Sequence, residues 1–215
     1  MRRLQNISAR IWNRGGSFLR EQHGGVVVEF ALVVSMFSFL FLALLDFGRL
    51  SYSGVNAQKA AQLATRIAVV RPPACAGVPQ THTRGTSALQ PRFGTPCNAS
   101  LGVCADPMTP TCLGDATNAT ASEIWDRVSP LLPPGTAISA MQFTYDFNSN
   151  LGFLGGPYTP MVTVELNLND FQFVSPLAAL ANAAGATNSI ISSTAGYSNF
   201  SVSLPAEDLA LGESG

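Results

Sequence analysis

The sequence predicts an α+β protein in which a long N-terminal helix packs on a small antiparallel sheet. The first observation is a 20-residue apolar run, Val26 to Leu45, near the N-terminus. The second is a helical repeat of small residues that continues from this run to Val70. The third is a pair of stretches, 137–147 and 161–173, in which apolar and polar residues alternate. Helical periodicity followed by paired alternating stretches predicts a helix first and a sheet after it.

The apolar run is long enough to cross a bilayer. At 1.5 Å per residue, 20 helical residues span about 30 Å, the thickness of the hydrocarbon core. Only Glu29 and two serines interrupt it. It is longer than a secretory h-region and no A-x-A site follows it, so a conventional cleaved signal peptide is not expected. We therefore predict a transmembrane helix over residues 25–45.

Charge is distributed unevenly about this run. Residues 1–24 hold five arginines and one acid, a net charge of +4, whereas residues 72–215 hold three arginines and ten acids, a net charge of −7. Positive flanks stay in the cytoplasm, so residues 1–24 are expected to form a basic leader peptide and the C-terminal part to lie outside. The acidic outer part carries no basic stripe, which argues against a nucleic-acid partner.

The helical pattern continues beyond the membrane segment. Between Asp46 and Val70, apolar or small residues recur every three or four positions, with polar residues between them. Many of the small residues are alanines, so this amphipathic half suits close packing against other helices or against the chain's own domain. Pro72-Pro73 is expected to end the helix, giving an extracytoplasmic continuation over residues 46–71.

Residues 72–215 are expected to form a disulfide-stapled extracytoplasmic domain with about three strands. The expected elements are a long loop over 72–120, a short helix over 121–133 capped by Ser122, a hairpin of 137–147 with 161–173, a small-residue loop or weak helix over 176–190, and a third strand over 199–206.

The four cysteines, Cys75, Cys97, Cys104 and Cys112, all lie in this domain. An even number in an oxidising compartment favours two disulfides. Zinc is the rival interpretation, but no C-x-x-C occurs and His82 is the one histidine nearby, so we expect no metal and no cofactor. Three pairings are possible, and loop economy favours Cys75–Cys97 with Cys104–Cys112.

Catalytic motifs are absent from the sequence. It contains no G-x-S-x-G elbow, no H-E-x-x-H and no P-loop. Asp146, Glu165 and Asp170 lie on or near the predicted hairpin, where solvated face residues are the simpler interpretation. A pair of catalytic carboxylates remains an open alternative, but no set of residues in the sequence indicates an active site. We therefore expect a protein that is not an enzyme and has no catalytic residues.

A glutamate stands at the start of the membrane segment, where an ionised carboxylate is costly. The stretch Gly24-Gly25-Val-Val-Val-Glu29-Phe30 has the form G-x-x-x-x-E-aromatic and follows a short basic leader. A second match to the same spacing, residues 16–21, is not followed by an apolar run. The site at Gly24 is therefore the stronger of the two.

This stretch resembles the prepilin-type processing site of the type IV pilin superfamily. The resemblance implies cleavage between Gly24 and Gly25 by a prepilin peptidase, and pairing of the buried Glu29 with the α-amino group of a subunit in the growing fibre. An ion pair in apolar surroundings is favourable only when both members are present, so it can select correctly docked subunits. The alternative is that Glu29 merely sits at the interface, with its carboxylate reaching water.

The resemblance extends along the helix. The V-E-F-A opening, the motif Asp46-Phe47-Gly48-Arg49 and the Ala/Gln/Arg-rich stretch through Arg66 are similar to TadE-like proteins, the minor pilins or pseudopilins of tight-adherence (Flp) pilus systems. The resemblance implies a pilin-like fold, binding to other pilin subunits through the N-terminal helix, and contact with the pilus assembly machinery of the inner membrane. Asp46 and Arg49 are three residues apart and are expected to pair at the membrane edge.

Two functions follow from these patterns. The first is a minor pilin or pseudopilin that primes a Tad/Flp-type adhesion pilus or sits at its tip. It would be held in the bacterial inner membrane by a single span, with a cytoplasmic N-terminus and a periplasmic C-terminal domain, and would also enter the extracellular pilus. The alternative is an uncleaved single-pass envelope protein whose outer domain binds a partner or ligand.

Overall fold

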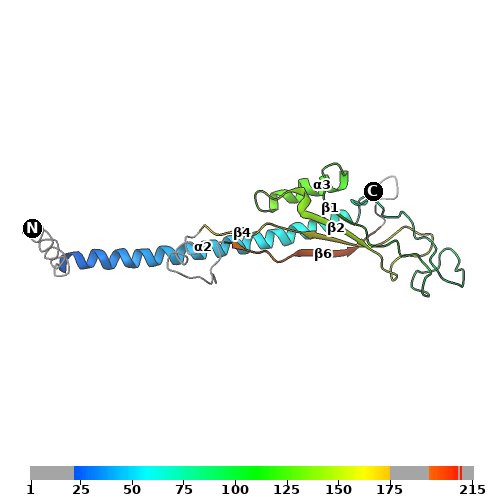
Figure 1. Ribbon diagram of the computed structural model, residues 1–215, viewed down its shortest axis with the longest axis horizontal. Helices are drawn as coiled ribbons and strands as arrows, with labels where there is room; N and C mark the ends of the chain where they lie inside the picture. Colours follow the sequence, from blue (N-terminus) through cyan, green and yellow to red (C-terminus); the bar gives the residue numbers. More distant parts are fainter. Residues whose placement is uncertain (1–21, 175–193, 208, 210–215) are drawn as a thin grey trace, which may run out of the picture. The chain divides into compact units, whose positions relative to one another are not determined.

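The computed structural model describes residues 22–174, 194–207 and 209. Residues up to Gly48, with Phe173 and Val174, belong to one compact unit, and those from Arg49 to Gln172, with those from Thr194 on, belong to a second. The loop or weak helix expected over 176–190, and the leader up to residue 21, lie outside the described residues. The elements are α2 (Gln22–Ala68), β1 (Thr111–Leu113), α3 (Ala119–Val128), the 3-10 helices η1 (Ser129–Leu131) and η2 (Ile138–Ala140), β2 (Met141–Asp146), β3 (Met161–Leu166), β4 (Phe171–Gln172), β5 (Thr194–Ala195) and β6 (Phe200–Pro205) (Figure 1).

The long helix predicted over 26–70 is confirmed as α2, which begins at Gln22 and ends at Ala68. Its N-terminal apolar window has a mean hydropathy of 2.4 and none of it is buried, so by length and composition α2 can cross a membrane. Both serines in the apolar run bond within the helix. Ser35 Oγ donates to the Ala31 carbonyl at 2.7 Å and Ser38 Oγ to the Val34 carbonyl at 2.8 Å. Neither hydroxyl is therefore left unsatisfied in lipid.

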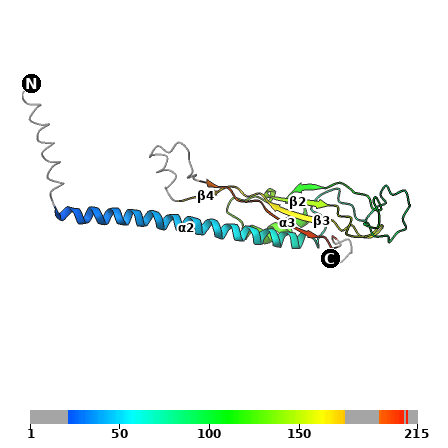
Figure 2. The ribbon, with the colours of Figure 1, turned by 90° about the horizontal axis from the view of Figure 1, so that it is seen from below.

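The alanine-rich face of α2 packs on the chain's own sheet. Its five alanines have no exposed surface and share one buried cluster with the inward-facing residues of β2 and β3; they are Ala57, Ala60, Ala61, Ala64 and Ala68. Figures 1 and 2 show the part of α2 that belongs to the second unit running along one side of the sheet. Alanine has no side chain beyond Cβ, so the helix axis comes close to the strands. Of the two packing partners that the sequence left open, the structure selects the chain's own domain.

Hydrogen bonds tie the exit of α2 to the rest of the second unit. The Thr65 hydroxyl donates to the Ala61 carbonyl at 2.8 Å and reaches the Val202 carbonyl of β6 at 3.3 Å. After the helix, the Ala74 N–H donates to the Tyr145 hydroxyl at 2.9 Å. The Thr120 hydroxyl of α3 donates to the Pro72 carbonyl at 2.8 Å. The segment after α2 that contains Pro72 and Pro73 is thus held against both the sheet and α3.

The sheet has four antiparallel strands in the order β1-β2-β3-β6. The predicted hairpin is confirmed by β2 and β3, which pair from Met141↔Leu166 to Asp146↔Met161. The predicted third strand is β6, which pairs with β3. Side chains alternate as expected, because Phe143, Tyr145, Val162 and Val164 are fully buried whereas their neighbours on each strand face outward.

Both predicted strands of the hairpin are longer in the sequence pattern than in the structure. The first is preceded by η2, and the second stops at Leu166, after which β4 pairs with β5 in a separate two-stranded sheet. Strand β1 lies in the stretch expected to be loop. Its three residues lie between Pro110 and Gly114, and pairing with β2 rather than local pattern defines it.

The short helix predicted over 121–133 is confirmed as α3, but the predicted cap was wrong. Asn118, not Ser122, is the N-cap, and its side-chain oxygen accepts from the Ala121 N–H at 3.0 Å. The helix also ends earlier, at Val128, because Pro130 follows and the chain continues as the 3-10 helix η1.

The close fit of α2 on the sheet gives a stability prediction. Replacing Ala64 with leucine is expected to lower the free energy of unfolding by about 1–3 kcal/mol, because added methylenes have no room in a packed interface. Gln62 is exposed, on a side of the helix that does not face the sheet. Gln62→Leu should therefore change the free energy of unfolding by less than about 0.5 kcal/mol. Urea denaturation of the full chain in non-ionic detergent, followed by tryptophan fluorescence, measures both. Equal effects of the two substitutions would contradict close packing at Ala64.

Candidate functional site

The N-terminal end of α2 carries the predicted processing site. Within the described residues α2 runs from Gln22, so the Gly24–Gly25 peptide bond lies in helical backbone. A methyl group added at Gly25 would meet no atom within 4 Å, so folding does not require glycine there. Glu29 and Phe30 are exposed, with Phe30 at 68%. Within the part of the chain that the structure describes, Glu29 forms no hydrogen bond or ion pair.

The apolar residues that follow Glu29 are exposed around the whole circumference of the helix. Large side chains on every face are between about one third and three quarters exposed, among them Leu32, Val33, Met36, Leu40 and Leu44. Monomeric soluble proteins do not present a continuous apolar surface of this length to water. This part of α2 therefore needs lipid or other helices around it.

The predicted membrane-edge pair, Asp46 and Arg49, falls on either side of the boundary between the two units. Asp46 is 3% exposed, a burial that a carboxylate tolerates only with partners. The Arg49 guanidinium lies over the Phe171 ring, 5.5 Å from its centre. Tyr197 packs edge-on to Phe171 and donates to the Ser53 hydroxyl at 2.9 Å. Pairing of Asp46 with Arg49 stays a prediction.

All four cysteines form disulfides, but the pairing expected from loop economy was wrong. Cys75 bonds to Cys112 and Cys97 bonds to Cys104. The physical reason is the sheet register. Pairing of β1 with β2 sets Cys112 opposite Phe143, and Cys75 Sγ lies 3.6 Å from the Phe143 carbonyl oxygen. The first disulfide therefore ties the exit of α2 to the edge of the sheet, and the second lies inside the loop that it closes.

The second disulfide belongs to a small buried cluster apart from the main core. Cys97 and Cys104 pack there with Val103 and Leu154. Single antiparallel bridges connect this part of the long loop, at Arg84↔Cys104 among others. Both cysteines are buried, with Cys97 at 3% and Cys104 at 6% exposed, yet they line an open hollow of about 940 Å³ together with Asn98 and Asp106.

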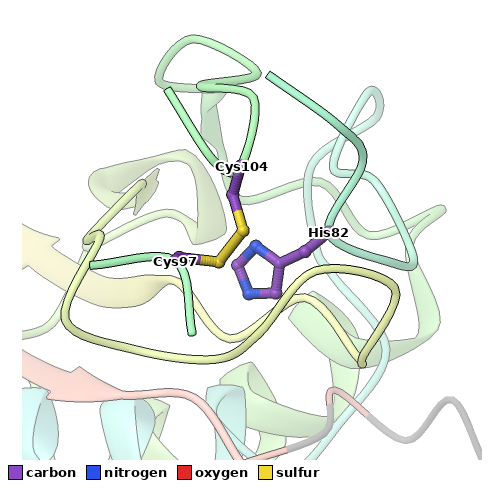
Figure 3. Close-up of side chains that lie close together, drawn as sticks. All are labelled: His82, Cys97 and Cys104. Atoms are coloured by element: carbon purple, nitrogen blue, oxygen red, sulfur yellow. A yellow bond between two sulfur atoms is a disulfide. The ribbon is translucent and has the colours of Figure 1, made fainter. Parts of the chain in front are cut away.

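His82 lies directly beside this disulfide (Figure 3). Its side chain is 2% exposed, and burial lowers the pKa of its imidazole, so the ring is neutral at pH 7. Nε2 accepts from the Thr159 N–H at 3.3 Å and lies 3.4 Å from the Thr159 hydroxyl. Nδ1 is buried and has no hydrogen-bond partner among the described residues. Figure 3 shows a ring nitrogen of His82 directed at the sulfur atoms of Cys97 and Cys104.

The turn between β2 and β3 holds His82 in place. The His82 N–H donates to the Gly156 carbonyl and the Gly155 N–H donates to the His82 carbonyl, both at 2.9 Å. The Cys97 N–H donates to the Gly152 carbonyl at 3.3 Å in the same turn. Gly152 has a φ of +76°, and a Cβ there would clash with the imidazole Nε2. One glycine-rich turn therefore brings His82 and Cys97 together.

Sequence reasoning missed this cluster. His82 lies in the long loop predicted over 72–120, and its neighbours Thr81 and Thr83 carry no burial signal. The hairpin predicted from 137–147 and 161–173 places residues 152–156 in its connection, but nothing in their sequence identifies His82 as a partner. Ring contacts with Phe147 and Tyr158, at 6.1 and 5.1 Å between centres, complete the enclosure.

The three carboxylates considered as catalytic candidates do not join the group formed by His82, Cys97 and Cys104. The Asp146 carboxylate accepts from the Thr109 hydroxyl at 2.9 Å, and the Glu165 carboxylate accepts from the Asn199 amide at 2.8 Å. Asp146 and Asp170 are exposed, and Glu165 is half-buried on the outward face of β3. Each polar contact is local to the outer surface of the second unit.

One segment of the chain matches a known protein family. Residues 24–66 match the family described as TadE-like protein. The match confirms the resemblance found in the sequence, and it spans Gly24, Glu29, Asp46 and Arg49. The sheet and both disulfides lie beyond it. Comparison with curated proteins and with solved structures finds no significant match.

Proposed function

We propose that this chain, whose residues 24–66 are TadE-like, is a minor pilin or pseudopilin of a Tad (Flp-type) pilus, processed by a prepilin peptidase. The TadE-like segment indicates involvement in a Tad pilus system, and that family is pilus-associated and structural rather than enzymatic. One observation carries the finer proposal. The membrane-length part of α2 exposes apolar side chains on all faces, and the one ionisable group among them is Glu29, five residues after Gly24.

Processing would create the partner that Glu29 lacks. Hydrolysis of the Gly24–Gly25 bond removes the basic leader and leaves an α-amino group on Gly25. Gly25 and Glu29 are four residues apart and lie on one face of α2, one helical turn or about 6 Å apart along its axis. In a helix bundle, the carboxylate of one subunit and the amine of its neighbour then compensate each other in surroundings where neither is stable alone.

The arrangement of the outer unit favours a priming or tip position. The sheet occupies the alanine face of α2, so that face is not available to other subunits. Other pilin subunits would instead contact the exposed segment over residues 25–45. A bulky outer unit on every subunit would prevent close helix packing along a filament, so we place few copies in each pilus.

We place the chain in the inner membrane, with the leader in the cytoplasm and the outer unit in the periplasm. The arginine-rich leader supports this orientation, as does the pair of disulfides, which form in oxidising compartments. The prepilin peptidase and the inner-membrane assembly machinery are the further proposed partners.

Processing is tested by co-expression with an active prepilin peptidase, followed by intact-mass measurement and N-terminal sequencing. The expected mature chain begins at Gly25. Gly24→Arg should abolish cleavage, because the peptidase needs close approach to the backbone before the cut. Gly16→Arg is the matched control, since it removes the other G-x-x-x-x-E match and should be cleaved like the wild type. A chain that keeps its leader beside active peptidase would support an uncleaved envelope protein with a partner-binding outer domain.

A further inference from the structure

We propose that His82, Cys97 and Cys104 form a binding site for one thiophilic cation, Zn²⁺ or Cu⁺, when the Cys97–Cys104 disulfide is reduced. This inference is independent of the pilus role, because it concerns residues outside the TadE-like segment. It rests on the geometry of three buried side chains on the long loop.

The three ligand atoms already lie within the span of a metal site. The sulfur atoms of Cys97 and Cys104 and a ring nitrogen of His82 are all within 4.8 Å of one another. Thiolate–metal and imidazole–metal bonds of about 2.3 and 2.0 Å hold the ligand atoms of one ion somewhat less than about 4 Å apart. The two sulfur atoms, which are bonded to each other in the disulfide, therefore have to move apart after reduction. Among the described residues, no other histidine, cysteine and carboxylate side chains converge in this way.

The histidine nitrogen is the second observation that points to a ligand. His82 is 2% exposed, and a buried polar atom nearly always has a partner. Its Nδ1 has none among the described residues, and Figure 3 shows a ring nitrogen directed at the Cys97–Cys104 sulfur atoms. A histidine retained for packing alone would be expected to satisfy both nitrogens. A cation between Nδ1 and the two sulfurs would supply the missing partner.

The other ring nitrogen, Nε2, lies beside a group that can accept its proton's hydrogen bond when a metal binds. When Nδ1 binds a metal, the ring proton moves to Nε2, which must then donate. The Thr159 hydroxyl lies 3.4 Å from Nε2 and is able to accept. The Thr159 N–H, which donates to Nε2 in the disulfide form, loses this acceptor when the proton moves. The backbone bonds of His82 to Gly155 and Gly156 hold the ring in position before any cation arrives.

Reduction is a balanced two-electron exchange with a dithiol. One thiolate of the dithiol attacks a sulfur of the Cys97–Cys104 bond and forms a mixed disulfide, and the second thiolate then releases the protein sulfur. The dithiol becomes a disulfide, and Cys97 and Cys104 become thiols. Binding of the cation then displaces two protons from these thiols. Both cysteines line the open hollow, which gives the dithiol and the cation a route from solvent.

The proposed ion follows from the ligand types. Two thiolates and one imidazole are soft or borderline ligands, which select Zn²⁺ and Cu⁺ over Mg²⁺ or Ca²⁺. Cu⁺ is satisfied by three such ligands. Zn²⁺ takes a fourth, which water from the hollow would provide. In either case the cation closes the same loop that the disulfide closes.

The test measures metal binding to the full-length protein in non-ionic detergent, oxidised and after treatment with a dithiol. Zn²⁺ is titrated against a chromophoric chelator, and Cu⁺ is titrated in the same way under anaerobic conditions. We expect tight binding of one ion per reduced chain and none to the oxidised chain. The Cys75→Ser/Cys112→Ser variant should still bind one ion, which shows that the other two cysteines are not needed.

Substitution of each of the two histidines tests whether His82 is a ligand. His82→Gln should weaken binding at least tenfold, whereas His23→Gln, which alters the other histidine, should bind like the wild type. Because His82→Gln can also disturb the buried cluster, X-ray absorption of the zinc-loaded wild type supplies an independent readout. It should show two sulfur neighbours and at least one nitrogen. Failure of the reduced wild type to bind either ion, or a shell of sulfur alone, would overturn the proposal.

Discussion

Replacing both Cys75 and Cys112 with serine is expected to lower the free energy of unfolding of the second unit by about 4 kcal/mol. The two cysteines are 37 residues apart, and a cross-link over that distance removes much of the chain entropy of the unfolded state. The bond also lies in the main core, where Cys75 is 6% exposed and belongs to the cluster formed by α2, α3 and the sheet.

The second disulfide is the matched control for this prediction. Cys97 and Cys104 are 7 residues apart, so the same chain-entropy argument gives a loss of about 2.5 kcal/mol for Cys97→Ser/Cys104→Ser. Urea denaturation in non-ionic detergent measures both variants, with Trp125 of α3 as the fluorescent probe in a Trp12→Phe background. The reverse order of stabilities would show that strain or residual structure, rather than loop length, decides the contribution of each bond.

The elements that sequence predicted correctly are those with a long, regular pattern. The helix over 26–70 and the alternation of Val162 and Val164 on β3 are set by side-chain periodicity, which local sequence contains in full. These features can be predicted without knowing the contacts that the rest of the chain makes.

The features that sequence reasoning missed depend on contacts between distant residues. Cys112 meets Cys75 only because three residues around it join the sheet beside Phe143, and such a short strand has no periodicity of its own. The burial of His82 depends on a turn about 70 residues later, whose glycines allow the backbone to pass close to the ring. Neither loop length nor local polarity contains information about these distant contacts. The disulfide pairing inferred from loop length was therefore wrong, and the burial of His82 was missed.

Charge, rather than shape, is expected to decide whether the processed chain enters a pilus. Glu29→Gln keeps the size of the side chain and the exposed apolar helix around it, so cleavage after Gly24 should proceed as in the wild type. Incorporation into sheared pili should fall at least tenfold, because removing one member of a pair in apolar surroundings leaves the other charge uncompensated at a cost of about 3–5 kcal/mol.

The measurement compares the mature chain in sheared pili and in membranes by immunoblot, for the wild type and for two glutamate variants. Glu21→Gln removes a carboxylate that processing discards with the leader, so it should enter pili normally. If Glu29→Gln were processed and incorporated like the wild type, the carboxylate would serve only as an interfacial group that reaches water. Loss of incorporation with normal processing would instead tie assembly to the amine that cleavage creates on Gly25, because that amine is the charge which a glutamine cannot compensate.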